Sequence, residues 1–500
     1  MFNTSTTRRS FLAMSTSLSL WLAGCGAAQT DASGETETGA ATQQSGEEAT
    51  NAPTKRETIT DDTDGGHAIA VSGEEKTYES VDVTKTGDDD GDEADFYGTN
   101  AAVYAEEGAT LTLKDITVTT DGAHANAVFS YGEGTTVNIS DSTIDTSNNC
   151  SGGIMVTGGG LLNATNLDIH TKGNSSAAIR SDRGGGTQVV SGGTYVTDGT
   201  GSPVVYSTAD VTVSDASMES TASQGVVVEG KNSVTLVNCD LVASNTTKNS
   251  DKSDWYQAVM IYQSMSGDAS EGEAHFAARG GAITNGNGDV FFVNNTVATI
   301  DLEDVAITND DQTGNFLRAA AAGWGNEGSN GGQVTVNAVK QRIAGTSLVD
   351  EVSHLNLILS DGSTLAGAIN PDGRAGDVYV ELADGCTWEL TADSHITALT
   401  CGTDAIALNG YVLYVGDDAY AEGTASTGEA IEATVSESTG GPGGGEPPAK
   451  PGEGSGGKPG DGGEPPAKPD GDAGAGAGGE PPAKPGESSD TTSTEATTTE

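Results

Sequence analysis

Large side chains recur at one position of a repeat, and they are the first residues that could bind a ligand. Each follows directly after a Val or an Ile, as Tyr104 follows Val103 and Tyr206 follows Val205. Successive strand residues point to opposite faces, so aliphatic residues that face a core would leave their successors on the outside. This outward column contains Tyr104, Phe129, Met155, Arg180, Tyr206, Val228 and, further on, Tyr262.

A second column lies two positions after the first and contains Glu106, Tyr131, Thr157 and Asp182. Sugars stack on aromatic rings and form bidentate hydrogen bonds with Arg and carboxylates. The two columns predict a shallow glycan-binding track whose ligand-binding residues are Tyr104, Phe129, Tyr131, Arg180, Asp182, Tyr206 and Tyr262. The alternative is that a side strand or a loop covers these side chains.

The same residues offer less for catalysis. A polysaccharide lyase uses an Arg or Lys base beside a calcium ion held by two or three carboxylates, but only Asp182 is within reach of Arg180 and Arg183 by sequence. A glycoside hydrolase needs paired carboxylates, and the neighbouring repeats offer Thr157 and Thr208 instead. The six histidines show no metal-ligand spacing. We expect no catalytic residue, with a lyase or hydrolase as the alternative.

Acidic side chains are densest between residues 88 and 95, and the spacing of their oxygens suits calcium. The candidate metal ligands are Asp88, Asp90 and Asp92. The segment lacks the Asp-x-Asp-x-Asp-Gly order and the distal Glu of a helix-loop-helix calcium site, so a solvated loop is the alternative. Calcium is the one cofactor that the sequence suggests.

Four cysteines follow Cys25 in the chain, at Cys150, Cys239, Cys386 and Cys401. Buried free thiols are the expectation for all four. Cys386 and Cys401 are close enough in sequence to lie on neighbouring repeats, so a disulfide between them is the alternative.

A second pattern indicates the elements that position these residues. Six segments alternate apolar and polar residues, skip one position and resume, as in Leu111–Val118 and Val137–Ile144. Asp and Asn tolerate left-handed backbone angles and satisfy a turn with their own side chains. Each segment therefore predicts a strand, a one-residue corner and a second strand. The corner residues are Asp115, Asp141, Asn166, Asp215, Asn238 and Asp304.

An upstream aliphatic strand completes each repeat, and its spacing is 22 to 26 residues. Three short strands per repeat of this length are typical of a right-handed parallel β-helix. We therefore predict an all-β single solenoid over residues 67–436. A polar insertion over Ala243–Asp254 interrupts the period just before Trp255. The inward residues of the upstream strand are Val103, Val128, Ile154, Ile179, Val205 and Val227.

The two ends of the chain differ from this body. Residues 1–24 resemble a twin-arginine signal peptide with Arg8 and Arg9, and Leu22–Cys25 resembles a bacterial lipobox. We expect lipidation of Cys25 to anchor the exported chain to a membrane. Residues 25–66 and 437–500 hold too few large apolar side chains to fold, which predicts a disordered stalk and a Pro/Gly-rich disordered tail.

The formal net charge is -51, and most of the acidic excess lies in residues 67–436. A surface with this much negative charge repels nucleic acid and anionic lipid. We therefore expect neither of them to bind it. Like-charged copies also repel each other, and we expect a monomer.

Five further segments carry a resemblance: Asp95–Ala101, Ala178–Gly184, Glu229–Ser233, Tyr262–Asp268 and Gly323–Ser329. These segments resemble adhesin-like β-helix surface proteins of gut-type anaerobic bacteria, within the pectate-lyase-like superfamily. This resemblance implies the fold and a place on the bacterial cell surface, and it implies no catalytic residue. We expect a non-enzymatic lipoprotein that binds glycans or the surface of a host or neighbouring cell. A structural envelope spacer is a further alternative.

Overall fold

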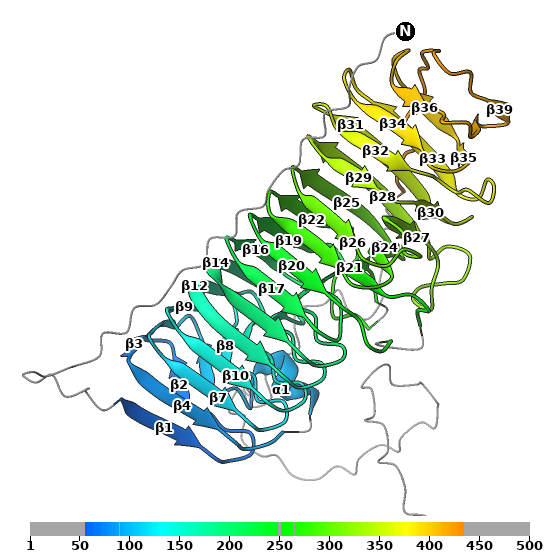
Figure 1. Cartoon of the computed structure of the whole chain (residues 1–500). Helices are drawn as coiled ribbons and strands as arrows, with labels where there is room; N and C mark the ends of the chain where they lie inside the picture. The colour runs from blue at the N-terminus through cyan, green and yellow to red at the C-terminus, as the bar shows by residue number, and fades with distance from the viewer. Residues whose placement is uncertain (1–55, 90, 249–251, 265, 435–500) are drawn as a thin grey trace, which may run out of the picture. The chain divides into compact units, whose positions relative to one another are not determined.

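The computed structural model describes residues 56–89, 91–248, 252–264 and 266–434. Within these ranges the chain forms 39 strands and one short helix, α1 (Asp92–Tyr97). The strands follow one another as stacked coils of a right-handed parallel β-helix (Figure 1), which confirms the predicted fold class. The predicted signal peptide, the predicted lipidation site Cys25, most of the predicted stalk and all of the predicted tail lie outside the described residues.

One sheet is built from the upstream strand of each coil. Its 11 strands are all parallel, because each coil returns to the same side before the next begins. In order they are β2 (Ile69–Ser72), β5 (Val103–Glu106), β8 (Val128–Tyr131), β11 (Ile154–Thr157), β13 (Ile179–Ser181), β15 (Val205–Ser207), β18 (Val226–Glu229), β21 (Gln257–Tyr262), β24 (Asp289–Asn294), β27 (Leu317–Ala319) and β30 (Ser347–Val349).

A 21-stranded sheet holds the strands on both sides of the corners. Its strands before the corner, including two that run through it, are β3 (Glu75–Glu79), β6 (Thr110–Lys114), β9 (Thr136–Ser140), β12 (Gly160–Thr171), β14 (Gly186–Thr197), β16 (Asp210–Ser214), β19 (Ser233–Val237), β22 (Glu273–Arg279), β25 (Thr296–Glu303), β28 (Gly332–Val339), β31 (His354–Ser360), β33 (Asp377–Leu382) and β36 (Ala398–Thr400). Its strands after the corner are β1 (Glu57–Asp61), β4 (Val81–Lys85), β7 (Thr117–Thr120), β10 (Thr143–Thr146), β17 (Ser217–Ser220), β20 (Asp240–Ala243), β23 (Ala282–Asn285) and β26 (Ala306–Asn309).

Two small sheets complete the last coils. The four-stranded sheet consists of β29 (Arg342–Ala344), β32 (Thr364–Gly367), β34 (Thr387–Leu390) and β37 (Ile406–Ala407). The three-stranded sheet consists of β35 (Ser394–Ile396), β38 (Leu413–Val415) and β39 (Asp418–Ala419). The pairing of β38 with β39 is antiparallel, so the chain turns back on itself there instead of adding a further parallel strand. Across the described ranges, no helix has the length and apolar character needed to cross a membrane.

The corners are single residues in the left-handed conformation, as predicted. The φ angle is 50° at Asp115 and Asp141 and 54° at Asn166, and it lies within the same few degrees at the other three corners. Stacked corners also bond each other, since Asn166 Nδ2 donates to Asp141 Oδ1 at 3.0 Å. Short polar side chains therefore set the bend and link one coil to the next.

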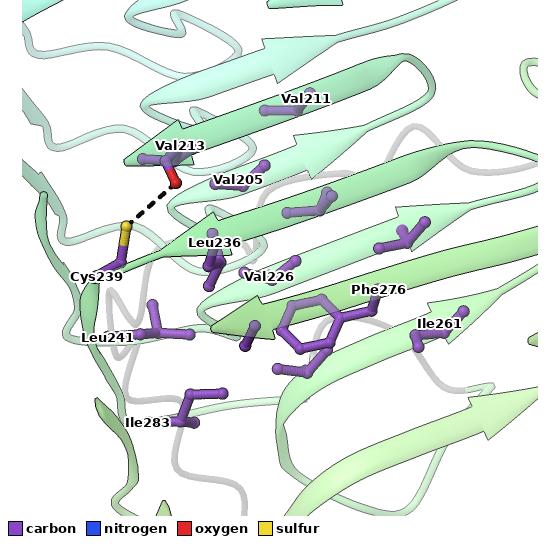
Figure 2. Packing of buried hydrophobic residues seen from close by; sticks show 14 of the residues in the cluster. Val205, Val211, Val213, Val226, Leu236, Cys239, Leu241, Ile261, Phe276 and Ile283 are labelled. Carbon is purple, nitrogen blue, oxygen red and sulfur yellow. Dashed lines mark hydrogen bonds between the residues drawn. The ribbon is translucent and has the colours of Figure 1, made fainter. Parts of the chain in front are cut away.

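The core is a continuous stack of mostly aliphatic side chains between the two large sheets (Figure 2). Cys239 belongs to this stack and donates from Sγ to the carbonyl of Val213 at 3.4 Å. Stacking identical positions on successive coils buries whole columns, and this explains why so few aromatic residues suffice. Side chains of the stack include Val205, Val211, Val226, Leu236, Leu241, Ile261, Phe276 and Ile283.

The predicted register is wrong by one residue in β18. Val205 pairs with Val226, and Tyr206 pairs with Val227. Val226 and Val228 therefore face the core, whereas Val227 faces outward. The run of three valines carries no alternation, so the sequence offers no signal for which of them points inward.

The predicted boundary of the stalk at residue 66 is also wrong, because the first coil begins with β1 at Glu57. β1 pairs in parallel with β4, and Ile59 packs against the core. Arg56 lies 2.7 Å from Asp82 and 2.9 Å from Asp115. One aliphatic side chain is enough here, since the partner strand already supplies a hydrophobic surface.

Candidate functional site

The outer face of the 11-stranded sheet carries one row of residues that are paired from coil to coil. The prediction is right for the column from Tyr104 to Tyr206 and wrong for Tyr262, which pairs with Glu229 in the second column. Met260 takes its place in the row. The full row is Ala70, Tyr104, Phe129, Met155, Arg180, Tyr206, Val227, Met260, Phe292, Arg318 and Leu348.

Helix α1 covers the first part of this row, so the predicted open track does not exist there. Tyr104 and Phe129 are buried in one cluster with Met155. A side-chain carbon at Gly98 would lie 2.8 Å from the Phe129 ring, so only glycine allows the chain to approach so closely, at a φ of 71°. Tyr131 is half-buried and makes an edge contact with Tyr97. The alternative of a cover over these side chains therefore holds for this part of the row, but the covering element is a helix and not a side strand or a loop. The helix lies in the acidic segment for which the sequence suggested a calcium site or a solvated loop.

Arg180 interrupts the row and makes two buried ion pairs. Its Nη1 lies 3.0 Å from Asp95 Oδ1 on α1, and its Nη2 lies 3.2 Å from Asp182 Oδ2. Both Arg180 and Asp182 are more than nine-tenths buried, so neither can contact a polysaccharide as predicted. Burial raises the pKa of Asp182 to about 7, against the opposing effect of Arg180. Burial also tends to raise the pKa of Asp95, but Arg180 and His124 outweigh it and hold this pKa below its usual value.

Two side chains from the turns of adjacent coils, His124 and Cys150, lie close to Asp95. His124 Nδ1 lies 3.3 Å from Asp95 Oδ2, and this carboxylate raises the pKa of His124 to about 10. One donor atom each from Asp95, His124 and Cys150 lies within 4.8 Å of the other two. The statement that the histidines lack metal-ligand spacing is therefore wrong for His124, because residues 26 apart stack on successive coils.

The cysteines are free thiols, as expected, in the part of the chain that the structure describes. Cys239, Cys386 and Cys401 are buried, whereas Cys150 is half-buried at the surface. The alternative of a disulfide between Cys386 and Cys401 is wrong for this structure.

Of the three predicted calcium ligands, the structure describes the side chain of Asp88 alone. Asp88 Oδ1 accepts a hydrogen bond from the backbone N–H of Ala123 at 2.8 Å, which links the turns of two coils. Asp90 and the side chain of Asp92 lie outside the described residues. Calcium binding at this segment stays a prediction.

A pocket of about 250 Å³ opens over the second part of the row. Trp255 stands against Phe292, with ring centroids 5.4 Å apart, and Trp324 meets Tyr262 edge-on at 5.2 Å. The guanidinium of Arg318 lies 4.5 Å from the centroid of the Trp255 ring. The aromatic residues that line the pocket are Tyr206, Trp255, Tyr256, Tyr262 and Trp324, so the aromatic surface that the columns predicted exists here in a more concave form.

Three amide side chains line the same pocket, and all are buried: Gln224, Asn245 and Gln257. Asn245 Nδ2 donates to the carbonyl of Gln257 at 3.0 Å, and Gln257 Nε2 donates to Met260 Sδ at 3.4 Å. Gln257 Oε1 has no hydrogen-bond partner among the described residues. An unsatisfied buried acceptor is costly, so this atom favours a site that receives a hydrogen-bond donor.

A buried carboxylate orients two of the three tyrosines of the pocket. Glu229 Oε2 accepts hydrogen bonds from the hydroxyls of Tyr206 and Tyr262, the latter at 2.9 Å. Burial raises the pKa of Glu229 above its usual value, against the lowering effect of these hydrogen bonds. The hydroxyls point to Glu229, so the rings are fixed in orientation.

Sequence reasoning missed the two tryptophans and the three amides. For part of this set the signal is the irregular segment after Ala243, where an insertion brings Asn245 and Trp255 beside the row. No family model, no curated protein and no solved structure matches the chain.

Proposed function

We propose that this protein is a non-enzymatic carbohydrate-binding β-helix of the bacterial cell surface, and that the pocket between Tyr206, Trp255, Tyr262 and Trp324 is its binding site. The observation that carries the proposal is that five aromatic side chains and three amides line one surface pocket. The resemblance to adhesin-like surface proteins and the predicted lipidation of Cys25 support the location.

The chemistry of the pocket suits a sugar. Aromatic faces pack against the C–H faces of a pyranose ring, while amides both donate to and accept from its hydroxyls. Gln257 Oε1 supplies an acceptor that nothing in the described structure uses. The volume of about 250 Å³ lies just below the usual range of small-ligand sites, which starts at roughly 300 Å³, so we expect one or two sugar residues to enter.

The composition of the pocket wall favours binding over cleavage. Glycoside hydrolases need two carboxyl groups on either side of the scissile bond. None of the described residues that line the pocket is Asp or Glu, and Glu229 behind the wall is engaged by two tyrosines. The lyase or hydrolase alternative becomes an outcome of the test.

The test is a glycan array probed with the purified protein, followed by titration of each bound glycan. We expect Trp255→Ala and Trp324→Ala each to weaken binding by about tenfold or more, since truncating an aromatic anchor at the centre of a site typically costs ~1.4 kcal/mol or more. Tyr411→Ala is the matched control, because Tyr411 is an exposed aromatic outside the pocket.

Two results would refute the proposal. The first is that no glycan binds at concentrations up to the millimolar range. The second is that binding is unchanged in both tryptophan variants. New reducing ends or unsaturated uronates in the same incubations would instead establish an enzyme.

A further inference from the structure

The turns of two adjacent coils and helix α1 bring three different metal-ligating side chains to one place. His124 and Cys150 occupy the same position of their turns, with φ angles of 54° and 57°. The backbone N–H of His124 donates to the carbonyl of Asn149 at 2.9 Å, so the two turns stack directly. Asp95 reaches them from α1, which packs over the first part of the outer row.

The donor atoms are close enough to share an ion. One atom each from Asp95, His124 and Cys150 lies within 4.8 Å of the others, and all three residues are half-buried. Nδ1 of His124 is buried, and it has no hydrogen-bond partner of good geometry among the described residues although Asp95 Oδ2 lies 3.3 Å away. His124 Nδ1 is thus close to the Cys150 thiol and the Asp95 carboxylate, as expected when the three groups bind one metal ion.

We propose that Asp95, His124 and Cys150 form a binding site for one zinc-type divalent cation. Sulfur, imidazole nitrogen and carboxylate oxygen together are the donor set of zinc, whereas calcium and magnesium take oxygen ligands only. Three protein ligands leave a fourth position of the tetrahedron open to water or an exogenous ligand.

The surroundings of the three ligands support the site. Asp95 Oδ1 is held by Arg180 Nη1 at 3.0 Å, which leaves Oδ2 turned toward His124. Such an outer contact fixes the orientation of a ligating carboxylate. Asp182 lies 3.2 Å from Arg180 and balances the positive charge of the guanidinium beside the cation.

A bound ion would tie α1 to the solenoid. The helix has six residues and carries no side-chain cap, so its own hydrogen bonds hold it weakly. A cation that joins Asp95 to two turns fixes the cover over Tyr104 and Phe129. Metal binding should therefore stabilise the N-terminal coils as well as occupy a site.

The test uses the purified full chain, freed of metal by a chelator and kept reduced. Cobalt(II) should produce a sulfur-to-metal charge-transfer band that saturates at about one ion per chain, and zinc should abolish that band by displacement. Cys150→Ser should remove the band. His124→Gln and Asp95→Asn should weaken zinc binding by about 100-fold or more, since even outer-shell changes cost 10–100-fold.

The controls separate this site from weaker surface binding. His170 lies 2.7 Å from Asp198 in a similar but exposed pair, so His170→Gln should leave zinc binding unchanged. Cys239→Ser should keep the charge-transfer band, because Cys239 lies in the core. If a ligand variant fails to fold, zinc should still slow alkylation of Cys150 in the unmodified protein, read by peptide mass spectrometry.

Three results would overturn the proposal. These are the absence of a charge-transfer band with cobalt, alkylation of Cys150 at the same rate with and without zinc, and zinc affinity that is unchanged in both Cys150→Ser and His124→Gln.

Discussion

Arg180 Nη1 contacts Asp95 Oδ1 at 3.0 Å, which joins β13 to a helix 85 residues earlier in the chain. This ion pair lies where the outer row changes from one hydrophobic cluster to the next. On one side α1 covers Tyr104 and Phe129, and on the other the row is open as a pocket lined by Tyr206. Arg180 thus marks the boundary between a structural cover and a candidate binding surface.

Removal of the Arg180 guanidinium should destabilise the packing of α1 over Tyr104 and Phe129. In Arg180→Ala the carboxyl groups of Asp95 and Asp182 both lose the guanidinium, and Asp95 keeps only the contact with His124. We expect the free energy of unfolding of the surrounding coils to fall by about 3–5 kcal/mol. Hydrogen exchange of β8, β11 and β13 measures this locally, as a solenoid need not unfold in one step. Lys172→Ala, which breaks an exposed pair with Asp145, should cost less than about 1 kcal/mol. Equal effects of the two changes would contradict a buried ion-pair role.

Asp182 should make the stability of these coils depend on pH. Burial raises its pKa from 3.8 to about 7, so between these values the folded state holds a proton that the unfolded chain releases. Its contribution is therefore fully present below about pH 3.8 and is lost as pH rises through about 7. The groups that face it are Arg180, Asp95, Asp268 and the backbone N–H of Arg183.

The comparison that isolates this effect is the wild type against Asp182→Asn, which cannot titrate. We expect hydrogen exchange of β13 to show the wild type losing stability relative to the variant as pH rises from about 4 to about 7. A constant difference across this range, or one that changes in the opposite direction, would show that Asp182 does not hold the proton in the folded state.

Burial on alternate sides of one strand gives a third prediction. On β14, Val190 is fully buried and its neighbour Val189 is 45% exposed. Val190→Ala should lower the free energy of unfolding by about 2 kcal/mol, from two lost methyl groups and the cavity they leave. Val189→Ala removes the same atoms from the solvent side and should change stability by less than about 0.5 kcal/mol. Chemical denaturation of both variants measures the contrast, and similar costs would argue against this register.

The sequence was sufficient for the fold because its signals are local and repeated. An Asp or Asn at each corner predicts a residue in the left-handed conformation. The alternation of apolar and polar residues in the strands on both sides predicts which side chains point inward. The prediction failed where alternation stops, as at Val226–Val228, and where a partner strand supplies most of the burial, as for Ile59 in β1.

The candidate sites were harder to predict because they depend on contacts between irregular segments. The column from Tyr104 to Tyr206 was placed correctly, but its cover by α1 depends on residues near Asp95 that look like a polar loop. The pocket depends on Trp255 and Trp324, which follow insertions with no period. His124 and Cys150 do carry a signal, since their separation equals the coil repeat, and this signal becomes meaningful once the turns are known to stack.

The fourth prediction concerns the corner residue Asn166 and its left-handed backbone conformation. Asn166 has a φ of 54°, a conformation that a β-branched residue adopts only at a cost, so Asn166→Val should lower the free energy of unfolding by about 2 kcal/mol. Asn166→Gly should change it by about 0.5 kcal/mol or less, because glycine accepts this φ and the lost hydrogen bond to Asp141 is exposed. Thr165→Val places the same side chain one residue earlier, at an exposed strand position, and should be nearly neutral. Thermal and chemical denaturation of the three variants separates backbone strain from side-chain chemistry. Equal losses for the valine and glycine variants would show that the Asn166 hydrogen bond, and not its backbone conformation, holds the corner.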